Sequence, residues 1–181
     1  LYGLAYRTDF DLSAHAGLSK ADLRYFDEQS EETDSEKKKY IAHCIEPSFG
    51  VDRTVLAVLM DAYREDVLGD EPRAYMKFSP KVAPVLVAVS PLLKNKPHLV
   101  DKAREVYMAL RKQFSGRVAY DDNGNIGKRY RRQDEIGTPF CVTIDHQTKE
   151  DNMVTIRYRD SMQQERVALS SIKDLVLKAV S

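Results

Sequence analysis

Cysteine, net charge and long apolar runs are all scarce in this chain of 181 residues, and each scarcity excludes a class of protein. The only two cysteines, Cys44 and Cys141, have no neighbouring cysteine and no histidine at metal-ligand spacing. We therefore expect two buried, reduced thiols, each in a strand, instead of a disulfide or a zinc site. Because 28 basic and 28 acidic residues cancel, any RNA-binding surface must be a local patch.

Membrane-spanning and secretory segments are also missing. The longest apolar run, residues 82–93, is interrupted by Pro84 and Pro91 and is too short to cross a bilayer. No secretory signal appears, and no Ser/His/Asp or Cys/His set for nucleophilic catalysis can be assembled. The chain begins at Leu1 instead of methionine, so we expect a fragment whose start is missing.

The stretch from residue 40 to residue 62 predicts a strand that turns sharply into a helix. Residues 40–45 form a short apolar run, Pro47 and Gly50 break it, and a helix follows from Val51. An apolar stripe at helical spacing would pack this helix against a sheet. The stripe consists of Val51, Val55, Val58, Leu59 and Ala62.

Polar residues gather around this turn. Arg53 lies off the stripe in the first turn of the helix, where exposed N–H groups already favour anions. Glu46 and Ser48 come just before, where polar side chains can converge on a small ligand. From spacing alone, an ordinary strand, turn and amphipathic helix without a ligand is the favoured explanation.

The residues themselves favour a ligand site. The run from Glu46 to Arg53, Glu-Pro-Ser-Phe-Gly-Val-Asp-Arg, resembles the third signature motif of class II aminoacyl-tRNA synthetases in the form found in dimeric glycyl-tRNA synthetases. The motif covers residues 46–56. The run from Gly3 to Leu12 resembles the Gly-Ile-Ala-x-Arg-Thr-Asp-x-Asp-Leu segment that precedes this motif in the same family.

This resemblance implies roles for individual residues. The glycine substrate would be bound by Glu46, Pro47, Ser48, Phe49 and Gly50. ATP would be bound by Leu1, Gly50, Val51, Asp52 and Arg53, with Arg53 on the phosphates and adenine. Arg7 and Asp9 would support the pocket, although a local salt-bridged turn with Asp11 explains them equally well.

The C-terminal half predicts an α/β fold with a five-stranded mixed sheet and three helices. Strands are expected at residues 85–89, 116–121 and 140–144, and an antiparallel hairpin at residues 154–159 and 165–169. Helices are expected from Pro97, over residues 126–136, and at the C-terminal end.

A glycine-rich turn and a basic cluster lie between residues 121 and 140. A dinucleotide site is disfavoured, because the full G-x-G-x-x-G is absent and no acidic residue sits at the required distance. Lys128, Arg131 and Arg132 share a helix face, as in a phosphate-contacting surface or in a merely solvated, salt-bridged one.

Two segments of this half carry a second resemblance. Gly124 through Pro139 matches the Gly-x-Ile-Gly-x-x-Tyr-x-x-x-Asp-x-x-Gly-x-Pro signature of the anticodon-binding domain in glycyl-, histidyl-, prolyl- and threonyl-tRNA synthetases. Arg157 through Asp160 is similar to a hairpin of the same domain. The resemblance implies tRNA contacts, for which the candidates are Lys128, Arg129, Arg131, Arg132, Arg157 and Arg159.

The resemblances divide the chain into three parts. Residues 1–70 would end a class II catalytic domain and its antiparallel sheet, 71–84 would be a linker, and 85–181 would bind the anticodon. The break in composition at residues 68–72 and the proline-rich run at 78–84 mark the boundary. The polar stretch 13–39 is expected to be a solvated loop.

The resemblance as a whole implies a glycine–tRNA ligase that uses ATP and Mg²⁺, binds glycine and tRNA(Gly), and forms a cytoplasmic homodimer without membrane contact. The first two class II motifs are absent, so we expect this fragment to be inactive by itself and to hold no metal ligands of its own. The alternatives are a non-catalytic RNA- or DNA-binding relative and a nucleotide-binding doubly wound domain. Retention of Arg53 and Ser48 favours the enzyme.

Overall fold

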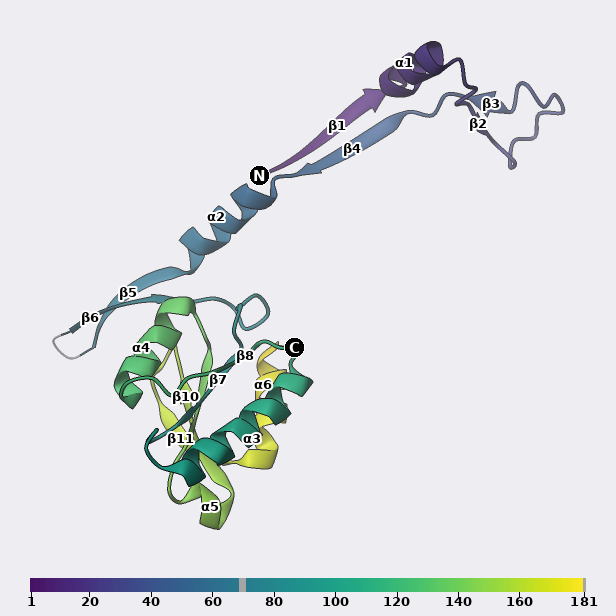
Figure 1. Cartoon of the computed structure of the whole chain (residues 1–181). Helices are drawn as coiled ribbons and strands as arrows, with labels where there is room; N and C mark the ends of the chain where they lie inside the picture. The colour runs from purple at the N-terminus through teal and green to yellow at the C-terminus, as the bar shows by residue number, and fades with distance from the viewer. Residues whose placement is uncertain (69–70, 181) are drawn as a thin grey trace. The chain divides into compact units, whose positions relative to one another are not determined.

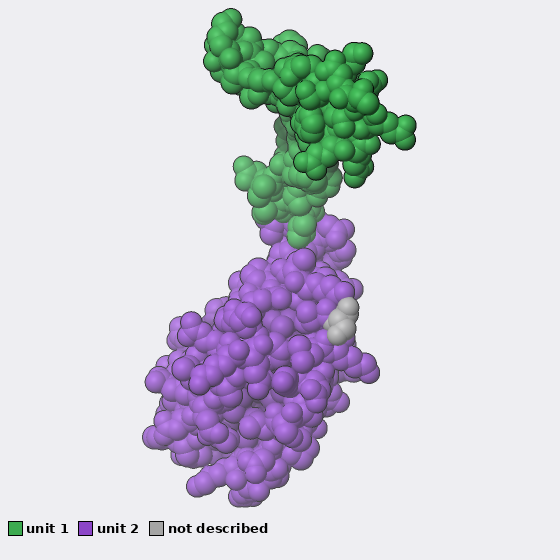
Figure 2. Space-filling model, turned by 90° about the vertical axis from the view of Figure 1, so that its right-hand side faces the viewer, with its two compact units in different colours: residues 1–58 green, residues 59–181 purple. Residues whose placement is uncertain are grey.

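The computed structural model describes residues 1–68 and 71–180. The chain forms two compact units, residues 1–58 and residues 59–181 (Figure 2). The predicted break at residues 68–72 includes Gly69 and Asp70, which lie outside the described residues.

The first unit is built on two antiparallel strands, β1 (Tyr2–Thr8) and β4 (Cys44–Phe49). Their register pairs Gly3 with Ser48 and Ala5 with Glu46. The predicted strand at residues 40–45 was placed too early, since β4 continues through Pro47 to Phe49. Pro47 is tolerated because β1 is the only strand paired with β4 among the described residues, so its missing N–H can face away from the ladder.

The polar stretch 13–39 contains more structure than the predicted loop. Helix α1 (Phe10–Ser19) begins after β1, and two short strands, β2 (Tyr25–Phe26) and β3 (Lys39–Tyr40), pair antiparallel. Local ion pairs hold acidic residues of this stretch, such as Glu36, which lies between the two strands and pairs with Lys39 at 2.7 Å. The prediction of a loop is therefore wrong for residues 13–19, 25–26 and 39, whereas residues 20–24 and 27–38 lie in no helix or strand.

Helix α2 (Val51–Ala62) begins where the sequence predicted it. Its apolar stripe, however, is not covered by the described residues, because Val51 and Val55 are exposed and only Ala62 is buried. The predicted packing against a sheet is thus absent from the described part of the chain.

The second unit opens with a hairpin that the sequence analysis missed, β5 (Tyr63–Leu68) and β6 (Glu71–Met76). The predicted linker at residues 71–84 includes β6 and the buried side chains of Phe78 and Ala83. Arg117 donates to the carbonyls of Pro80 and Ala83, both at 2.7 Å. These residues are therefore packed on the C-terminal unit, because apolar side chains and backbone carbonyls within them find partners there.

The sheet of the second unit has the strand order β11-β10-β9-β7-β8 (Figure 1). Its strands are β7 (Val87–Pro91), β8 (Val118–Tyr120), β9 (Phe140–Ile144), β10 (Met153–Tyr158) and β11 (Gln164–Ala168). The pairs β7–β8 and β7–β9 are parallel, and β9–β10 and β10–β11 are antiparallel. The prediction of a five-stranded mixed sheet is confirmed.

The helices of this unit are α3 (Pro97–Gln113), α4 (Ile126–Ile136), a short α5 (Thr148–Asp151) and α6 (Ile172–Val180), which follows the 3-10 turn Leu169–Ser171. Pro97 opens α3 as predicted, and α4 has its predicted bounds. The short α5 is the helix that the sequence analysis did not foresee.

The two faces of the sheet differ in chemistry. Alternate side chains such as Val142 and Val154 join the apolar core with residues of α3 and α6. The intervening side chains, Cys141, Thr143 and Arg157, belong to the other face, where α4 contributes a buried layer of Arg129, Gln133 and Asp134. One face is thus held by apolar burial and the other by polar contacts.

Neither cysteine is paired: Cys141 is buried and Cys44 is only half-buried. Burial raises the pKa of the Cys141 thiol to about 12. No helix among residues 1–68 and 71–180 is both long and apolar enough to cross a membrane.

Gly137 generates the first prediction, because it ends α4 with a φ of 85°. A Cβ at this position would collide with the Phe78 ring and lie 2.8 Å from the Met76 carbonyl oxygen. Gly137→Ala should therefore lower the free energy of unfolding by about 3 kcal/mol, from strained backbone plus overpacking. Urea denaturation measures this loss.

Gly116 is the matched control, since its φ is 81° but a Cβ there would meet nothing within 4 Å. Gly116→Ala should cost only the backbone term, about 1 kcal/mol. Equal losses in the two variants would show that the segment around Met76 and Phe78 does not press against the end of α4.

Candidate functional site

The first candidate site lies on one face of the β1–β4 pair. Alternation along the strands places Gly3 and Ala5 on the same face as Ser48 and Glu46. Large side chains lie on the opposite face, where the rings of Tyr2 and Phe49 meet at 5.2 Å. The polar face therefore has open space next to Ser48 and Glu46, because the residues paired with them, Gly3 and Ala5, are small.

A salt bridge fixes the carboxylate on this face. Arg7 Nε donates to Glu46 Oε2 at 2.9 Å, and Ser48 Oγ donates to Glu46 Oε1 at 3.3 Å. The hydrogen bond from Arg7 lowers the pKa of Glu46, so the carboxylate is ionised at neutral pH. The strand register shifts between Tyr6 and Thr8, next to Arg7. Arg7 is thus bonded to Glu46, and its support of a ligand pocket stays a prediction.

The turn into α2 brings further predicted residues together. The Gly50 N–H donates to the Leu1 carbonyl at 3.1 Å, and a Cβ on Gly50 would lie 3.3 Å from that oxygen. The same Cβ would lie 3.6 Å from Arg53 side-chain atoms. Leu1, Gly50 and Arg53 are therefore neighbours. Asp9 instead accepts a hydrogen bond from Ser13 Oγ at the start of α1.

The second candidate site is a groove of about 680 Å³ in the C-terminal unit. It runs between the N-terminal half of α4 and the β10–β11 hairpin. Its lining residues are Arg73, Asn125, Gly127, Lys128, Tyr130, Arg131, Asp134, Arg157, Met162 and Gln164. Lys128 and Arg131 are exposed, whereas Tyr130 is half-buried.

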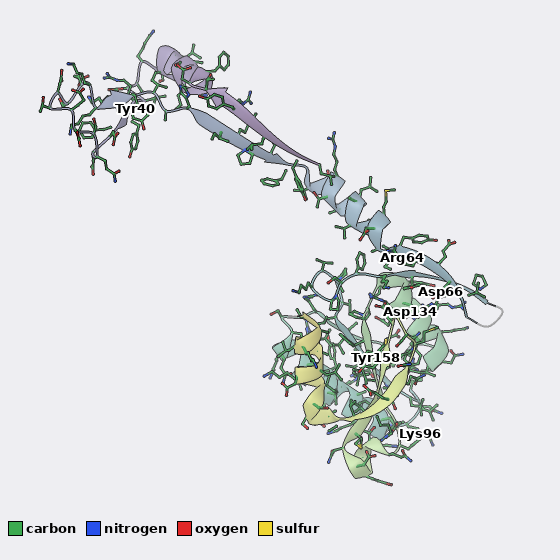
Figure 3. The ribbon with its side chains drawn as sticks, turned by 180° about the vertical axis from the view of Figure 1, so that it is seen from behind. Tyr40, Arg64, Asp66, Lys96, Asp134 and Tyr158 are labelled. Atoms are coloured by element: carbon green, nitrogen blue, oxygen red, sulfur yellow. The ribbon has the colours of Figure 1, made fainter. Side chains whose placement is uncertain are left out.

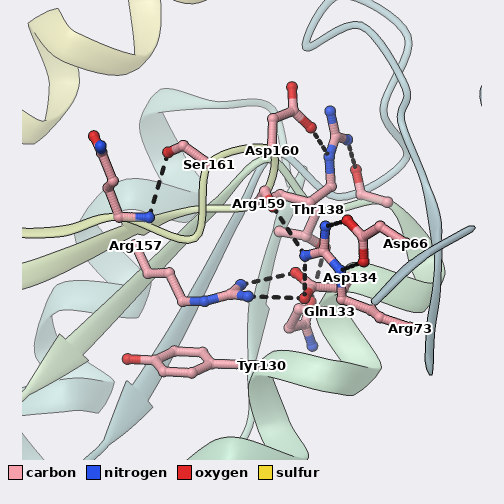
Figure 4. A network of polar contacts seen from close by, with 12 residues as sticks. Asp66, Arg73, Tyr130, Gln133, Asp134, Thr138, Arg157, Arg159, Asp160 and Ser161 are labelled. Carbon is pink, nitrogen blue, oxygen red and sulfur yellow. Dashed lines mark hydrogen bonds and ion pairs between the residues drawn. The ribbon is translucent and has the colours of Figure 1, made fainter. Parts of the chain in front are cut away.

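Three of the charged residues that line this groove, Arg73, Asp134 and Arg157, are buried and belong to one network of polar contacts (Figure 4). Both nitrogens at the end of the Arg157 side chain donate to Asp134, each at 2.8 Å. Arg73 Nη1 donates to the same carboxylate at 3.2 Å, and Arg73 also binds Asp66 at 2.5 Å. Arg157 lies 4.8 Å over the ring of Tyr130. We call Asp66, Arg73, Asp134 and Arg157 the charge network.

The structure separates the six basic residues that were predicted to contact tRNA. Arg129 and Arg159 are buried, and their guanidinium groups bind backbone carbonyls, including those of Gly124, Gly137 and Phe78 at 2.7–2.9 Å. Arg157 is 5% exposed, and Arg132 pairs with Asp121 at 2.7 Å. Lys128 and Arg131 are exposed at the groove. These two side chains are the most accessible of the six, and their contact with RNA stays a prediction.

Sequence reasoning missed Arg73, Tyr130 and Asp134. Asp134 and Tyr130 belong to the matched signature, which was a usable signal, whereas Arg73 is assigned to no motif. The described ranges, 1–68 and 71–180, contain no cluster of three or more metal-ligating side chains suited to a metal ion.

Comparison with known proteins gives two findings. Residues 86–179 match the family described as "Anticodon binding domain". The chain is 48% identical over 186 residues to a protein of Thermobifida fusca named "Glycine--tRNA ligase", with 100% of the chain and 38% of the relative covered. Proteins of the same name from Lysinibacillus sphaericus and Chlorobaculum tepidum are 49% and 48% identical, covering 98% and 96% of the chain but 36% and 35% of the relatives.

Asp66 generates a prediction about acid stability. Hydrogen bonds from Arg73 lower the pKa of Asp66 from its ordinary value of 3.8. A lowered pKa means that the ionised form stabilises the fold above the ordinary value, and that this stability is lost as the pH falls through the native value. Asp66→Asn should therefore flatten the decline in the free energy of unfolding as the pH falls below ~5.

Urea denaturation across this pH range measures the effect. Asp101→Asn removes an exposed carboxylate of α3 outside the charge network and serves as the control. The same flattening in Asp101→Asn would contradict a specific role of Asp66.

Proposed function

The chain belongs to the glycine–tRNA ligase family, and we propose that it forms part of an enzyme that joins glycine to tRNA(Gly) with ATP. It spans about 38% of the length of the Thermobifida fusca relative. The main support for the proposal is that Glu46 and Ser48 lie on the same face of the β1–β4 pair, next to the turn that carries Arg53.

Glycine is the substrate that this face suits. Ionised Glu46 and the Ser48 hydroxyl offer acceptors to one ammonium group, and Gly3 and Ala5 leave space for a very small molecule. Selection of glycine must be steric, because glycine has no side chain for the protein to bind. Pro47 and Phe49 belong to the strand that carries these acceptors.

ATP would bind at the start of α2. The Gly50 N–H already bonds to the Leu1 carbonyl, while Val51, Asp52 and Arg53 form the first turn of the helix. The Arg53 guanidinium would hold the phosphates. Mg²⁺ would accompany ATP chiefly through phosphate oxygens, and Asp52 is the acidic side chain of this turn.

Both steps of the reaction use a nucleophile supplied by a substrate, so the protein contributes mainly by positioning the substrates and stabilising charge. The glycine carboxylate attacks the α-phosphorus of ATP and pyrophosphate leaves, and a tRNA hydroxyl then attacks the glycyl carbonyl and AMP leaves. Glu46 orients glycine by its ammonium group, while Arg53 stabilises charge on the phosphates. The complete enzyme would be a cytoplasmic homodimer, and the chain alone would not complete the reaction.

The groove of the C-terminal unit would receive the anticodon loop of tRNA(Gly). Unstacked RNA bases are bound by aromatic and arginine side chains within a basic rim. Tyr130 supplies an aromatic ring in the groove, with Arg157 lying 4.8 Å over it, and Lys128 and Arg131 supply the basic rim.

Arg53 tests the catalytic half of the proposal. In the full-length ligase, Arg53→Gln should lower glycine-dependent exchange of pyrophosphate into ATP by about 10²–10³-fold, as expected for loss of a charge that stabilises the transition state. Arg64→Gln, which removes an exposed arginine of β5, is the control and should retain full exchange. Absence of glycine-dependent exchange in the wild type, with tRNA binding intact, would favour the non-catalytic RNA-binding relative.

Lys128 tests the RNA half. Lys128→Gln should weaken tRNA(Gly) binding and reduce the slope of log K against log salt concentration by about 1, because one phosphate contact is lost. Lys102→Gln on α3, where Lys102 pairs with Glu105 at 2.9 Å, is the control. An unchanged slope in Lys128→Gln would remove this residue from the RNA contact.

A further inference from the structure

We infer that the tRNA site extends beyond the anticodon-binding domain, and that Arg73 of β6 is a positioning residue for tRNA. The inference depends on the proposed binding of tRNA in the groove. Arg73 lies outside the segment 86–179 that matches the domain family. It nevertheless lines the groove together with residues of α4 and β10.

Arg73 is placed to join three segments of the chain. Its side chain is 2% exposed, and its Nη1 donates both to Asp134 of α4 at 3.2 Å and to the Arg159 carbonyl at 3.1 Å. Its Nε and Nη2 bind Asp66 of β5 at 2.8 and 2.5 Å. The guanidinium also lies 4.1 Å over the ring of Tyr75. Because all three nitrogens of the guanidinium group donate hydrogen bonds, the Arg73 side chain has little conformational freedom.

The contacts continue from Arg73 through Asp134 to Arg157 and Tyr130 (Figure 4). Figure 3 shows the two carboxylates of the network, Asp66 and Asp134, close to each other in the second unit. Asp134 is 2% exposed and receives a bidentate pair from Arg157, which in turn lies over Tyr130. The orientation of Arg157 thus depends on a carboxylate that Arg73 also holds. Tyr130 is restrained as well, because its hydroxyl bonds to Thr143 at 2.8 Å.

Charge balance gives Arg73 a second effect. The charge network contains two carboxylates and two guanidinium groups, so its formal charge is zero. Removing Arg73 leaves one uncompensated negative charge beneath a groove that would bind a polyanion. Loss of Arg73 should therefore weaken RNA binding both by misplacing Arg157 and by changing the charge, and a double variant separates these effects.

The test measures tRNA(Gly) affinity for the whole chain and four variants that are first shown to be folded by circular dichroism. Arg73→Met should bind about tenfold more weakly, in the range of coupling between contacting residues, with the salt slope of the wild type because Arg73 reaches no phosphate. Arg73→Met combined with Asp66→Asn restores the formal charge and should regain only part of the lost affinity, because Arg157 stays misplaced. Arg73→Lys should bind with intermediate affinity, because lysine keeps the positive charge but cannot form the several hydrogen bonds of the guanidinium group.

Arg64→Met is the matched control, because it removes a positive charge from the neighbouring strand outside the charge network. It should bind as the wild type does. Wild-type affinity in folded Arg73→Met, or full recovery in the double variant, would overturn the positioning role. A wild-type chain that does not bind tRNA(Gly) would instead overturn the proposed function.

Hydrogen exchange provides a measurement that needs no variant. Binding of tRNA(Gly) to the wild-type chain should slow amide exchange in β6 as well as in α4 and β10, since the charge network joins them. Slower exchange confined to α4 and the β10–β11 hairpin would overturn the inference, even if Arg73→Met fails to fold.

Discussion

The buried carboxylate of Asp134 is the point on which the C-terminal unit depends. Two guanidinium groups share it, one from β6 and one from β10, while Asp134 itself lies on α4. A buried carboxylate is costly to desolvate, so the arrangement is stable only with all its partners present. The result is that helix, hairpin and sheet are held at one place by directional contacts, which apolar packing alone does not provide.

This constraint explains why the two faces of the sheet differ. The face with α3 and α6 is an ordinary apolar core, in which side chains such as Leu99, Val142 and Ile156 are almost fully buried. The face with α4 has a layer of hydrogen bonds in place of apolar contacts, including those of Arg129 and Arg159 to backbone carbonyls. The buried polar groups of α4 stabilise the fold and also lie next to the groove, because Lys128 and Tyr130, on either side of Arg129 in the sequence, line it.

The N-terminal unit contains a smaller example of the same interaction, an ion pair between an arginine and a carboxylate. Arg7 and Ser48 hold the Glu46 carboxylate in one orientation on a strand pair whose opposite residues are small. Both candidate sites therefore use an arginine to fix a carboxylate. In the first the carboxylate is exposed, and in the second it is buried and fixes another arginine.

The sequence by itself determined the elements with strong local signals. Helix α4 and strand β9 have their predicted bounds, because capping and periodicity act over a few positions. The motif at residues 46–56 likewise led to the prediction that Glu46, Ser48 and Arg53 form a site, since its signature residues lie close together in the sequence. Only the tertiary structure decided that Arg129, Arg157 and Arg159 are buried, that residues 71–84 pack on the C-terminal unit, and that Arg73 reaches Asp134, 61 positions away. The reason is that a charged residue has the same local pattern whether it faces water or a partner, and the partner is supplied by a distant segment of the chain.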